Sequence, residues 1–221
     1  TDQSTSFIED KSIPDPSPAN TKATLAEICK PYTGTVDCEG VTSKCKVYAA
    51  RIDALISDPT LARFMKANMV EESSCKIEVH SKTTQYGVAY GIFQQLPGTA
   101  QTFASKCGIT AKIDGAWLTN PANIDADICI QEKFIKYLQS TSCGTDWRNI
   151  AAAQDSGPGW CKPSADCKNE TSCIPGNNPV KAWECPWDNP EHTQINTRLE
   201  ETRNASRKMM YCVDNPGSWA K

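Results

Sequence analysis

The sequence predicts a mainly α-helical, disulfide-rich domain, and two observations carry this expectation. Apolar residues recur at helical spacing through most of residues 46–213, whereas convincing alternating strands are scarce. Twelve cysteines are scattered along the 221 residues without repeated close Cys-x2-Cys pairs, a pattern that favours disulfides over zinc ligation. We therefore expect an exported protein with mostly paired cysteines, and residues 76–90 can hold one small β-hairpin.

Composition narrows the function classes. Hydrophobic residues make up 39% and charged residues 22%, and no apolar run approaches the ~18 residues of a membrane span, so we expect no transmembrane segment. The net charge of −3 gives no sign of a nucleic-acid partner. The only histidines, His80 and His192, are too isolated to form a zinc site by themselves, so we expect no metal. No signal-peptide pattern opens the chain, which we interpret as a mature, extracytoplasmic form.

The chain divides into three expected parts. Residues 1–24 are mostly polar and contain three alternating prolines, which predicts a disordered tail suited to tethering the protein to a larger envelope or virion assembly. Residues 25–45 form a cysteine-rich lead-in, and residues 46–221 form the main domain. Within it, residues 156–191 contain four cysteines but too few apolar residues for a core of their own. We expect an irregular excursion held by disulfides, not a second domain.

Six helices are expected from apolar spacing and from helix start and stop signals. The first runs from residue 46 to Asp58-Pro59, where proline breaks it. The others cover about residues 60–74, 98–107, 121–141, 146–155 and 193–213. Asn120-Pro121 has the pattern of an N-cap followed by proline at the first helical position. The buried face of the helix that follows is marked by Ile124, Ile128, Ile135 and Leu138.

The helix that includes Leu61 carries a carboxylate in the middle of its apolar stripe. At about 100° per residue with Leu61 at zero, the stripe centres at about 15°, Glu72 falls at about 20° and Glu71 at about −80°. Apolar surroundings raise the pKa of an unpaired carboxyl group, which suits a general acid working near neutral pH. The commoner role of a glutamate at a helix end is a cap or a salt bridge, and that interpretation stays open on geometry alone.

The sequence around and after this glutamate contains a series of short motifs. Glu72-Ser73 is followed by AYGIFQQLPGTA at residues 89–100, NPANI at 120–124, AAAQDSGPG at 151–159 and ETRN at 201–204. In this order they resemble the soluble lytic transglycosylase family, whose members carry Glu-Ser, A-x-G-L-M-Q-x-x-P-x-T-A, D-P-x-x-N-I, A-A-Y-N-A-G-P-G and E-T-R-N-Y-V. The resemblance spans about residues 65–212 and implies a lysozyme-like α fold.

The resemblance also implies a substrate and a reaction. The family cuts glycan strands of peptidoglycan at the β-1,4 bond between N-acetylmuramic acid and N-acetylglucosamine. One glutamate protonates the glycosidic oxygen and then acts as base while the 6-hydroxyl of the sugar closes a 1,6-anhydro ring. This role falls on Glu72, and it requires no metal or organic cofactor. Such an enzyme works outside the cytoplasm, as a secreted, periplasmic or virion-associated protein.

Neighbouring residues receive roles from the same resemblance. Ser73 would hydrogen-bond the substrate or orient the carboxyl group, and Gln94 would face the sugar beside it. Phe93, where the family commonly has methionine, would supply an apolar wall of the cleft. Tyr90 of the same motif is assigned to substrate binding. A tight turn at Gly91 would aim Gln94.

The chain also departs from the family pattern. Gln154 and Asp155 stand where family members usually have tyrosine and asparagine, and Ala205 stands where a tyrosine is expected in the last helix. We expect Gln154 and Asp155 to contribute to the substrate site. The connection between the Glu-Ser pair and the AYGIFQQLPGTA motif is longer than usual, so this loop is remodelled.

Two further functions remain open. A lysozyme-type muramidase hydrolyses the same bond and needs a second carboxylate, about 5 Å from the acid in a retaining enzyme or ~6.5–9.5 Å away in an inverting one. Asp155 and Glu78 are the candidates for that group. The third possibility is a catalytically weak module that binds glycan or serves a structural role.

Overall fold

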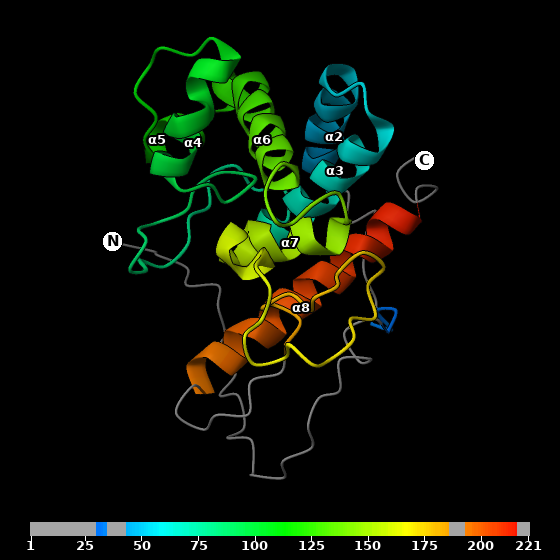
Figure 1. Ribbon diagram of the computed structural model, residues 1–221. Coiled ribbons are helices and arrows are strands. Elements are labelled where there is room, and N and C mark those ends of the chain that lie inside the picture. The colour runs from blue at the N-terminus through cyan, green and yellow to red at the C-terminus, as the bar shows by residue number, and fades with distance from the viewer. Residues whose placement is uncertain (1–29, 35–42, 186–192, 216–221) are drawn as a thin grey trace, which may run out of the picture.

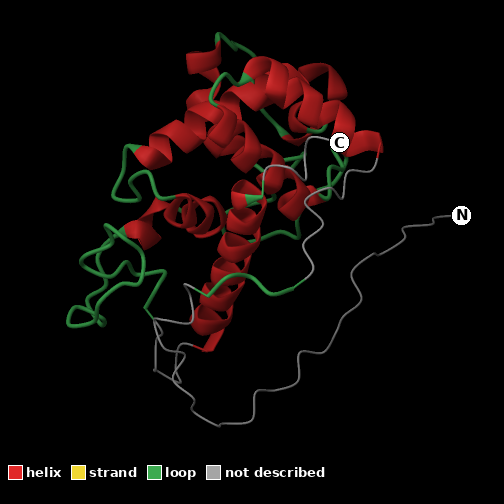
Figure 2. Cartoon of the chain, turned by 90° about the vertical axis from the view of Figure 1, so that its right-hand side faces the viewer, coloured by secondary structure: helices red, strands yellow, loops and turns green. Residues whose placement is uncertain are grey.

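The computed structural model describes residues 30–34, 43–185 and 193–215, and this part of the chain is mainly helical (Figures 1 and 2). The helices are α2 (Ser43–Leu55), α3 (Pro59–Ser73), α4 (Pro97–Ala104), α5 (Gly115–Leu118), α6 (Ile124–Gln139), α7 (Trp147–Ser156) and α8 (Thr193–Asp214). Three short 3-10 turns accompany them at Ser105–Cys107, Pro121–Asn123 and Pro158–Cys161. The tail expected at residues 1–24 and most of the lead-in expected at 25–45 lie outside the described residues.

The helices pack around two apolar clusters. In Figure 1, α8 crosses beneath α7, and it packs against both α7 and α3. The main core forms where α2, α3, α6, α7 and α8 meet, and Phe64, Ile128 and Ile150 are among its fully buried members. A smaller cluster joins α4, α5 and α6 around Phe103 and Ile130. Helix α6 contributes side chains to both clusters and therefore connects them.

Helix α3 carries Glu72 near its C-terminal end. Its N-cap is Asp58, whose Oδ1 accepts hydrogen bonds from the backbone amides of Thr60 at 2.9 Å and Leu61 at 3.2 Å. The helix ends at Ser74, which adopts the left-handed conformation and donates its amide to carbonyl oxygens of the last turn. Glu72 therefore lies in the last turn of a helix that is fixed at both ends.

The connection between α3 and α4, where the sequence allowed a small β-hairpin at residues 76–90, forms isolated antiparallel bridges. The bridges pair His80 with Tyr90, Thr84 with Gly87, and Tyr90 with Gln95. Residues 82–86 are exposed, so this part of the loop has no apolar face that burial could stabilise as a strand. The bridges instead return the chain to the end of α3.

Disulfides pair the cysteines in the described part of the chain. The described pairs are Cys45–Cys75, Cys107–Cys129, Cys143–Cys161 and Cys167–Cys185. None of the cysteines in the described residues is free, which confirms the expected disulfide chemistry for this part of the chain. Such pairing is typical of proteins that fold in an oxidising, extracytoplasmic compartment. None of the described helices combines the length and apolarity that crossing a membrane requires.

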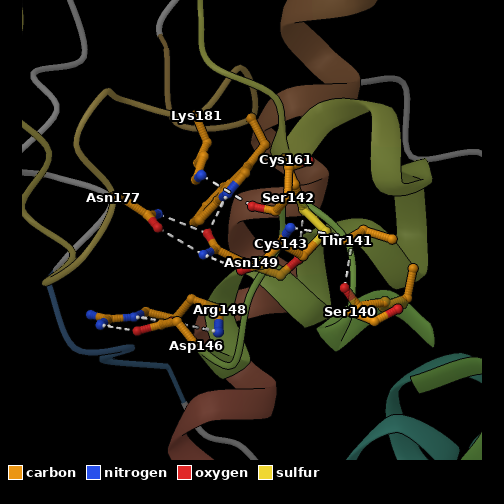
Figure 3. Close-up of a disulfide and its surroundings, with 12 residues drawn as sticks. Ser140, Thr141, Ser142, Cys143, Asp146, Arg148, Asn149, Cys161, Asn177 and Lys181 are labelled. Carbon is orange, nitrogen blue, oxygen red and sulfur yellow. Dashed lines mark hydrogen bonds and ion pairs between the residues drawn. A yellow bond between two sulfur atoms is a disulfide. The ribbon is translucent and has the colours of Figure 1, made fainter. Parts of the chain in front are cut away.

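The segment after α7 is irregular and is fixed to that helix by a disulfide and by polar contacts. Figure 3 shows the Cys143–Cys161 disulfide beside Asn149 and Asn177. The two asparagine side chains exchange hydrogen bonds of 2.8 Å in each direction. The buried indole of Trp183 donates to Asn149 Oδ1 at 2.9 Å. Buried amides therefore help to hold this segment in place, together with its apolar contacts.

Candidate active site

Glu72 and Glu71 have different surroundings at the end of α3. Glu72 is half-buried, and its Oε1 accepts a hydrogen bond from Nδ2 of Asn68, one helical turn earlier, at 3.3 Å. The Oε1 atom of Glu71 lies 3.3 Å from Nζ of Lys208 on α8, in an ion pair at the protein surface. The angle about the helix axis therefore predicts correctly which of the two carboxyl groups turns inward.

Burial raises the pKa of Glu72 to about 8, and the negative charges of Asp155 and Glu71 act in the same direction. The hydrogen bond from Asn68 opposes the rise because it stabilises the ionised carboxylate. At neutral pH the side chain is therefore mostly protonated and can act as a proton donor.

Four buried or half-buried amide side chains form a connected chain that leads to Glu72. Gln131 of α6 lies at its centre and is fully buried. Its Nε2 donates to Oδ1 of Asn68 at 3.0 Å and to Oε1 of Gln154 at 2.9 Å. Its Oε1 accepts from Nε2 of Gln95 at 2.9 Å. Gln154 is thereby connected to Glu72 through Gln131 and Asn68. Of these four amides, only Gln154 was predicted from the sequence as a site residue.

Ser73 and Phe93 are placed differently from expectation. The Ser73 hydroxyl lies 3.0 Å from the carbonyl oxygen of Met69 and 2.9 Å from that of Ile92, so it ties α3 to the following turn and does not orient the Glu72 carboxyl. Phe93 is fully buried in the main core and is not an exposed cleft wall. Burial of a phenylalanine side chain contributes roughly 1.5–3 kcal/mol, which explains why the ring packs inward.

Gln94 and Tyr90 lie in the turn between the bridges and α4. Gln94 has a φ of 47°, and its Nε2 donates to the carbonyl oxygens of Gly91 at 2.8 Å and Val79 at 3.3 Å. Its amide group therefore stabilises the turn, contrary to the expectation that it projects toward a sugar. Tyr90 is half-buried beside the smaller apolar cluster, with its ring centroid 6.0 Å from that of His80. Its role in substrate binding stays a prediction.

Replacement of Gly91 by alanine should destabilise the protein. Gly91 has a φ of 78°, and a Cβ added there would lie 2.6 Å from the carbonyl oxygen of Leu118. We expect Gly91→Ala to lower the free energy of unfolding by more than about 1 kcal/mol, measured by urea denaturation. Gly98→Ala is the control, because a Cβ at this helical position meets nothing within 4 Å. An unchanged Gly91→Ala midpoint would contradict the expected clash.

Asp155 provides a second carboxylate near Glu72. Its Oδ2 accepts hydrogen bonds from Ser156 Oγ at 2.7 Å and Thr202 Oγ1 at 2.5 Å. Its negative charge acts on Glu72 strongly enough to raise the pKa of that group. Glu78, the other candidate for this role, is exposed, and its charge adds to the effect of burial in raising the pKa of Tyr48. The structure therefore favours Asp155 over Glu78 as the partner carboxylate.

No family match is found. The chain matches no protein-family model, no curated protein and no solved structure. The geometry around Glu72 and the order of the sequence motifs are therefore the features that bear on function. Among residues 30–34, 43–185 and 193–215, no group of three or more histidine, cysteine, aspartate or glutamate side chains could hold a metal ion.

A further buried carboxyl group, which the sequence analysis missed, belongs to Asp127 of α6. Its Oδ1 is buried without a hydrogen-bond partner, and burial raises the pKa of the group to about 8. It lies one helical turn before Gln131. Because a buried carboxylate without partners is costly, Asp127 is mostly protonated at neutral pH and adds little charge to the interior.

Proposed function

We propose that the chain is a peptidoglycan lytic transglycosylase with a lysozyme-like fold, in which Glu72 acts first as acid and then as base. Its proton passes to the glycosidic oxygen between N-acetylmuramic acid and N-acetylglucosamine, and the bond from this oxygen to the anomeric carbon breaks. The ionised Glu72 then takes the proton of the 6-hydroxyl of N-acetylmuramic acid. The oxygen of that hydroxyl bonds to the anomeric carbon and closes the 1,6-anhydro ring.

One observation carries the proposal: the Glu72 carboxyl group is half-buried at the end of α3, and this burial raises its pKa to about 8. A group with a pKa near the working pH can both give and regain a proton, which this single-residue mechanism requires. Asn68 supports the second half of the cycle because its amide donates to the carboxylate that remains after proton transfer. Peptidoglycan is proposed as the substrate because the motifs follow one another in the order found in the family that they resemble. An extracytoplasmic location fits both peptidoglycan and the disulfides.

A specific observation also favours a second candidate, a muramidase that hydrolyses the same bond. Asp155 is exposed and close enough to influence Glu72 electrostatically, so it is a candidate to position a water molecule or to stabilise the developing positive charge. Mass spectrometry of fragments released from purified sacculi separates the two reactions. A transglycosylase leaves 1,6-anhydro ends, whereas a muramidase leaves reducing ends. Glycan binding without fragment release would support the catalytically weak module and contradict both enzymes.

The pH dependence of cleavage provides a prediction. Because the acid form of Glu72 starts the reaction, kcat/KM should be retained below a pH of about 8 and lost as the pH rises through that value. In Asp155→Asn a negative charge that raises the pKa of Glu72 is removed, so the basic limb should move to lower pH. Initial rates of sacculus solubilisation between pH values of about 5 and 10 measure the basic limb in the unmodified protein and in Asp155→Asn. A basic limb that stays in place in Asp155→Asn would contradict the electrostatic coupling.

A further inference from the structure

The amide of Gln131 is fully used in hydrogen bonds within the protein. Both N–H groups on its Nε2 have acceptors, Oδ1 of Asn68 and Oε1 of Gln154, and its Oε1 accepts from Gln95. Gln131 and Asn68 are fully buried, and Gln95 is nearly so. In such surroundings an unpaired amide group is costly. Oε1 of Gln95 is buried without a hydrogen-bond partner, whereas the contacts of Gln131 favour one orientation of its own amide.

Rotation of a single amide in this chain would break several contacts at once. If the Gln131 amide turned by 180°, its oxygen would face two oxygens and its N–H groups would face the N–H group of Gln95. If Asn68 turned, its NH2 group would face that of Gln131, and its oxygen could pair with Glu72 only while Glu72 is protonated. Reversal of the whole chain would give Gln95 Oε1 a donor, but it would leave one Gln131 N–H and the buried NH2 group of Gln95 without an acceptor. The observed polarity therefore directs a donor at Glu72.

We propose that Gln131 is a positioning residue, which holds the Asn68 amide with its NH2 group toward Glu72 so that the carboxylate always has a hydrogen-bond donor when it acts as base. Gln131 does not contact Glu72 itself, and its effect passes through Asn68. The catalytic consequence rests on the proposed function, whereas the effect on Glu72 itself does not.

Other charged groups act on the same carboxyl and define the background of the effect. Asp155 of α7 and Glu71 of α3 both raise the pKa of Glu72, and Glu71 is paired with Lys208 of α8. On α6, the acid one turn before Gln131 is Asp127, and burial raises its pKa to about 8. The hydrogen bond from Asn68, at the end of the amide chain, opposes these groups because it lowers the pKa of Glu72.

The proposal is tested by titrating Glu72 directly. NMR of protein with 13C-labelled glutamate carboxyl groups follows its ionisation, and the Glu72 signal is assigned from its loss in Glu72→Gln. Gln131→Met keeps the size of the side chain without its hydrogen-bonding groups, so Asn68 is no longer held. We expect the Glu72 pKa to rise by about one unit, a tenfold change in its ionisation constant, because the carboxylate loses a hydrogen-bond donor.

A double-mutant cycle separates positioning from general loosening of the core. Asn68→Leu removes the donor itself and should raise the Glu72 pKa at least as much as Gln131→Met does. In the Asn68→Leu background, Gln131→Met should cause no further shift, because its effect passes through Asn68. Ile135→Val trims a fully buried residue one turn along α6 and should leave the titration unchanged. Equal shifts in both backgrounds, or no shift in Gln131→Met, would overturn the proposal.

A measurement on the unmodified protein covers the case in which Gln131→Met does not fold. The side-chain N–H signals of Asn68 and Gln131 should titrate with the midpoint of Glu72, and both titrations should vanish in Glu72→Gln. Invariant Asn68 N–H signals would also overturn the proposal. These readouts do not need activity. A protein that cleaves no peptidoglycan but shows the coupled titration would therefore refute the proposed function and leave the role of Gln131 standing.

Discussion

Glu72→Gln is expected to lower the rate of peptidoglycan cleavage by roughly 10²–10⁴-fold, the usual contribution of general acid–base catalysis. Glutamine keeps the size of the side chain, and its carbonyl oxygen can still accept the hydrogen bond from Asn68, but it has no proton to give. The release of soluble fragments from purified sacculi measures the loss. Binding to intact sacculi should be retained, because the fold and the neighbouring side chains are unchanged.

Glu71→Gln is the control for this experiment. It removes a carboxylate from the adjacent position, but that group is engaged with Lys208 at the surface, so cleavage should continue.

Thermal stability gives an independent check of the fold. The pKa of Glu72 is raised in the folded state, so its ionisation opposes folding increasingly between its ordinary value of about 4.5 and about 8. Glu72→Gln should therefore match the unmodified protein at low pH and have a higher Tm at pH about 8. Unchanged cleavage by Glu72→Gln would refute the assignment.

Loss of the Cys45–Cys75 disulfide should produce the second large effect. The bond closes a loop of 30 residues and fixes Cys75, three positions after Glu72, to α2. For a loop of this length, removal of the cross-link costs about 3–4 kcal/mol in the chain-entropy model, which corresponds to a fall in Tm of roughly 10 °C. We expect Cys45→Ala/Cys75→Ala to lose cleavage activity well below its Tm, because the end of α3 is released.

The matched control removes the Cys167–Cys185 disulfide, which closes a loop of 18 residues in the irregular segment after α7. The loss of Tm should be similar, since the entropy term depends only weakly on loop length. Activity below the Tm should persist, because this disulfide lies outside the elements that hold Glu72. Calorimetry and cleavage rates on both double variants test the distinction, and equal losses of activity would show that global stability alone is responsible.

The sequence predicted most helices because their apolar residues recur at helical spacing and their ends carry recognisable signals. Asp58 before Pro59 marks the start of α3, and Asn120 accepts from the backbone amide of Ala122 before α6. The four-residue helix α5 was missed because it is too short to show a period. The possible small hairpin at residues 76–90 is present only as isolated antiparallel bridges, because a longer strand ladder is stabilised where one of its faces is buried.

The candidate site was only partly predictable. Angle about the helix axis identified Glu72, but the same reasoning also places Asn68 at about −20°, within the apolar stripe of α3. Gln131 likewise stands between Ile128 and Ile135 on the buried face of α6. An amide side chain on the apolar face of a helix was therefore the sequence signal that could have predicted Asn68 and Gln131 as buried polar residues. Their partners come from different helices, so the hydrogen-bonded pairs could not be found without the packing.

Asn149 imposes a condition on any attempt to graft a shorter loop onto this scaffold. Two donors that approach its Oδ1, from Asn177 and Trp183, belong to the irregular segment, and the atom is buried. A chimera that lacks residues 162–185 would remove both donors, and Asn149 Oδ1 would stay unpaired wherever the new loop covers it. Such trimming would have to replace Asn149 with an apolar residue at the same time, so loop and helix are exchangeable only as a unit.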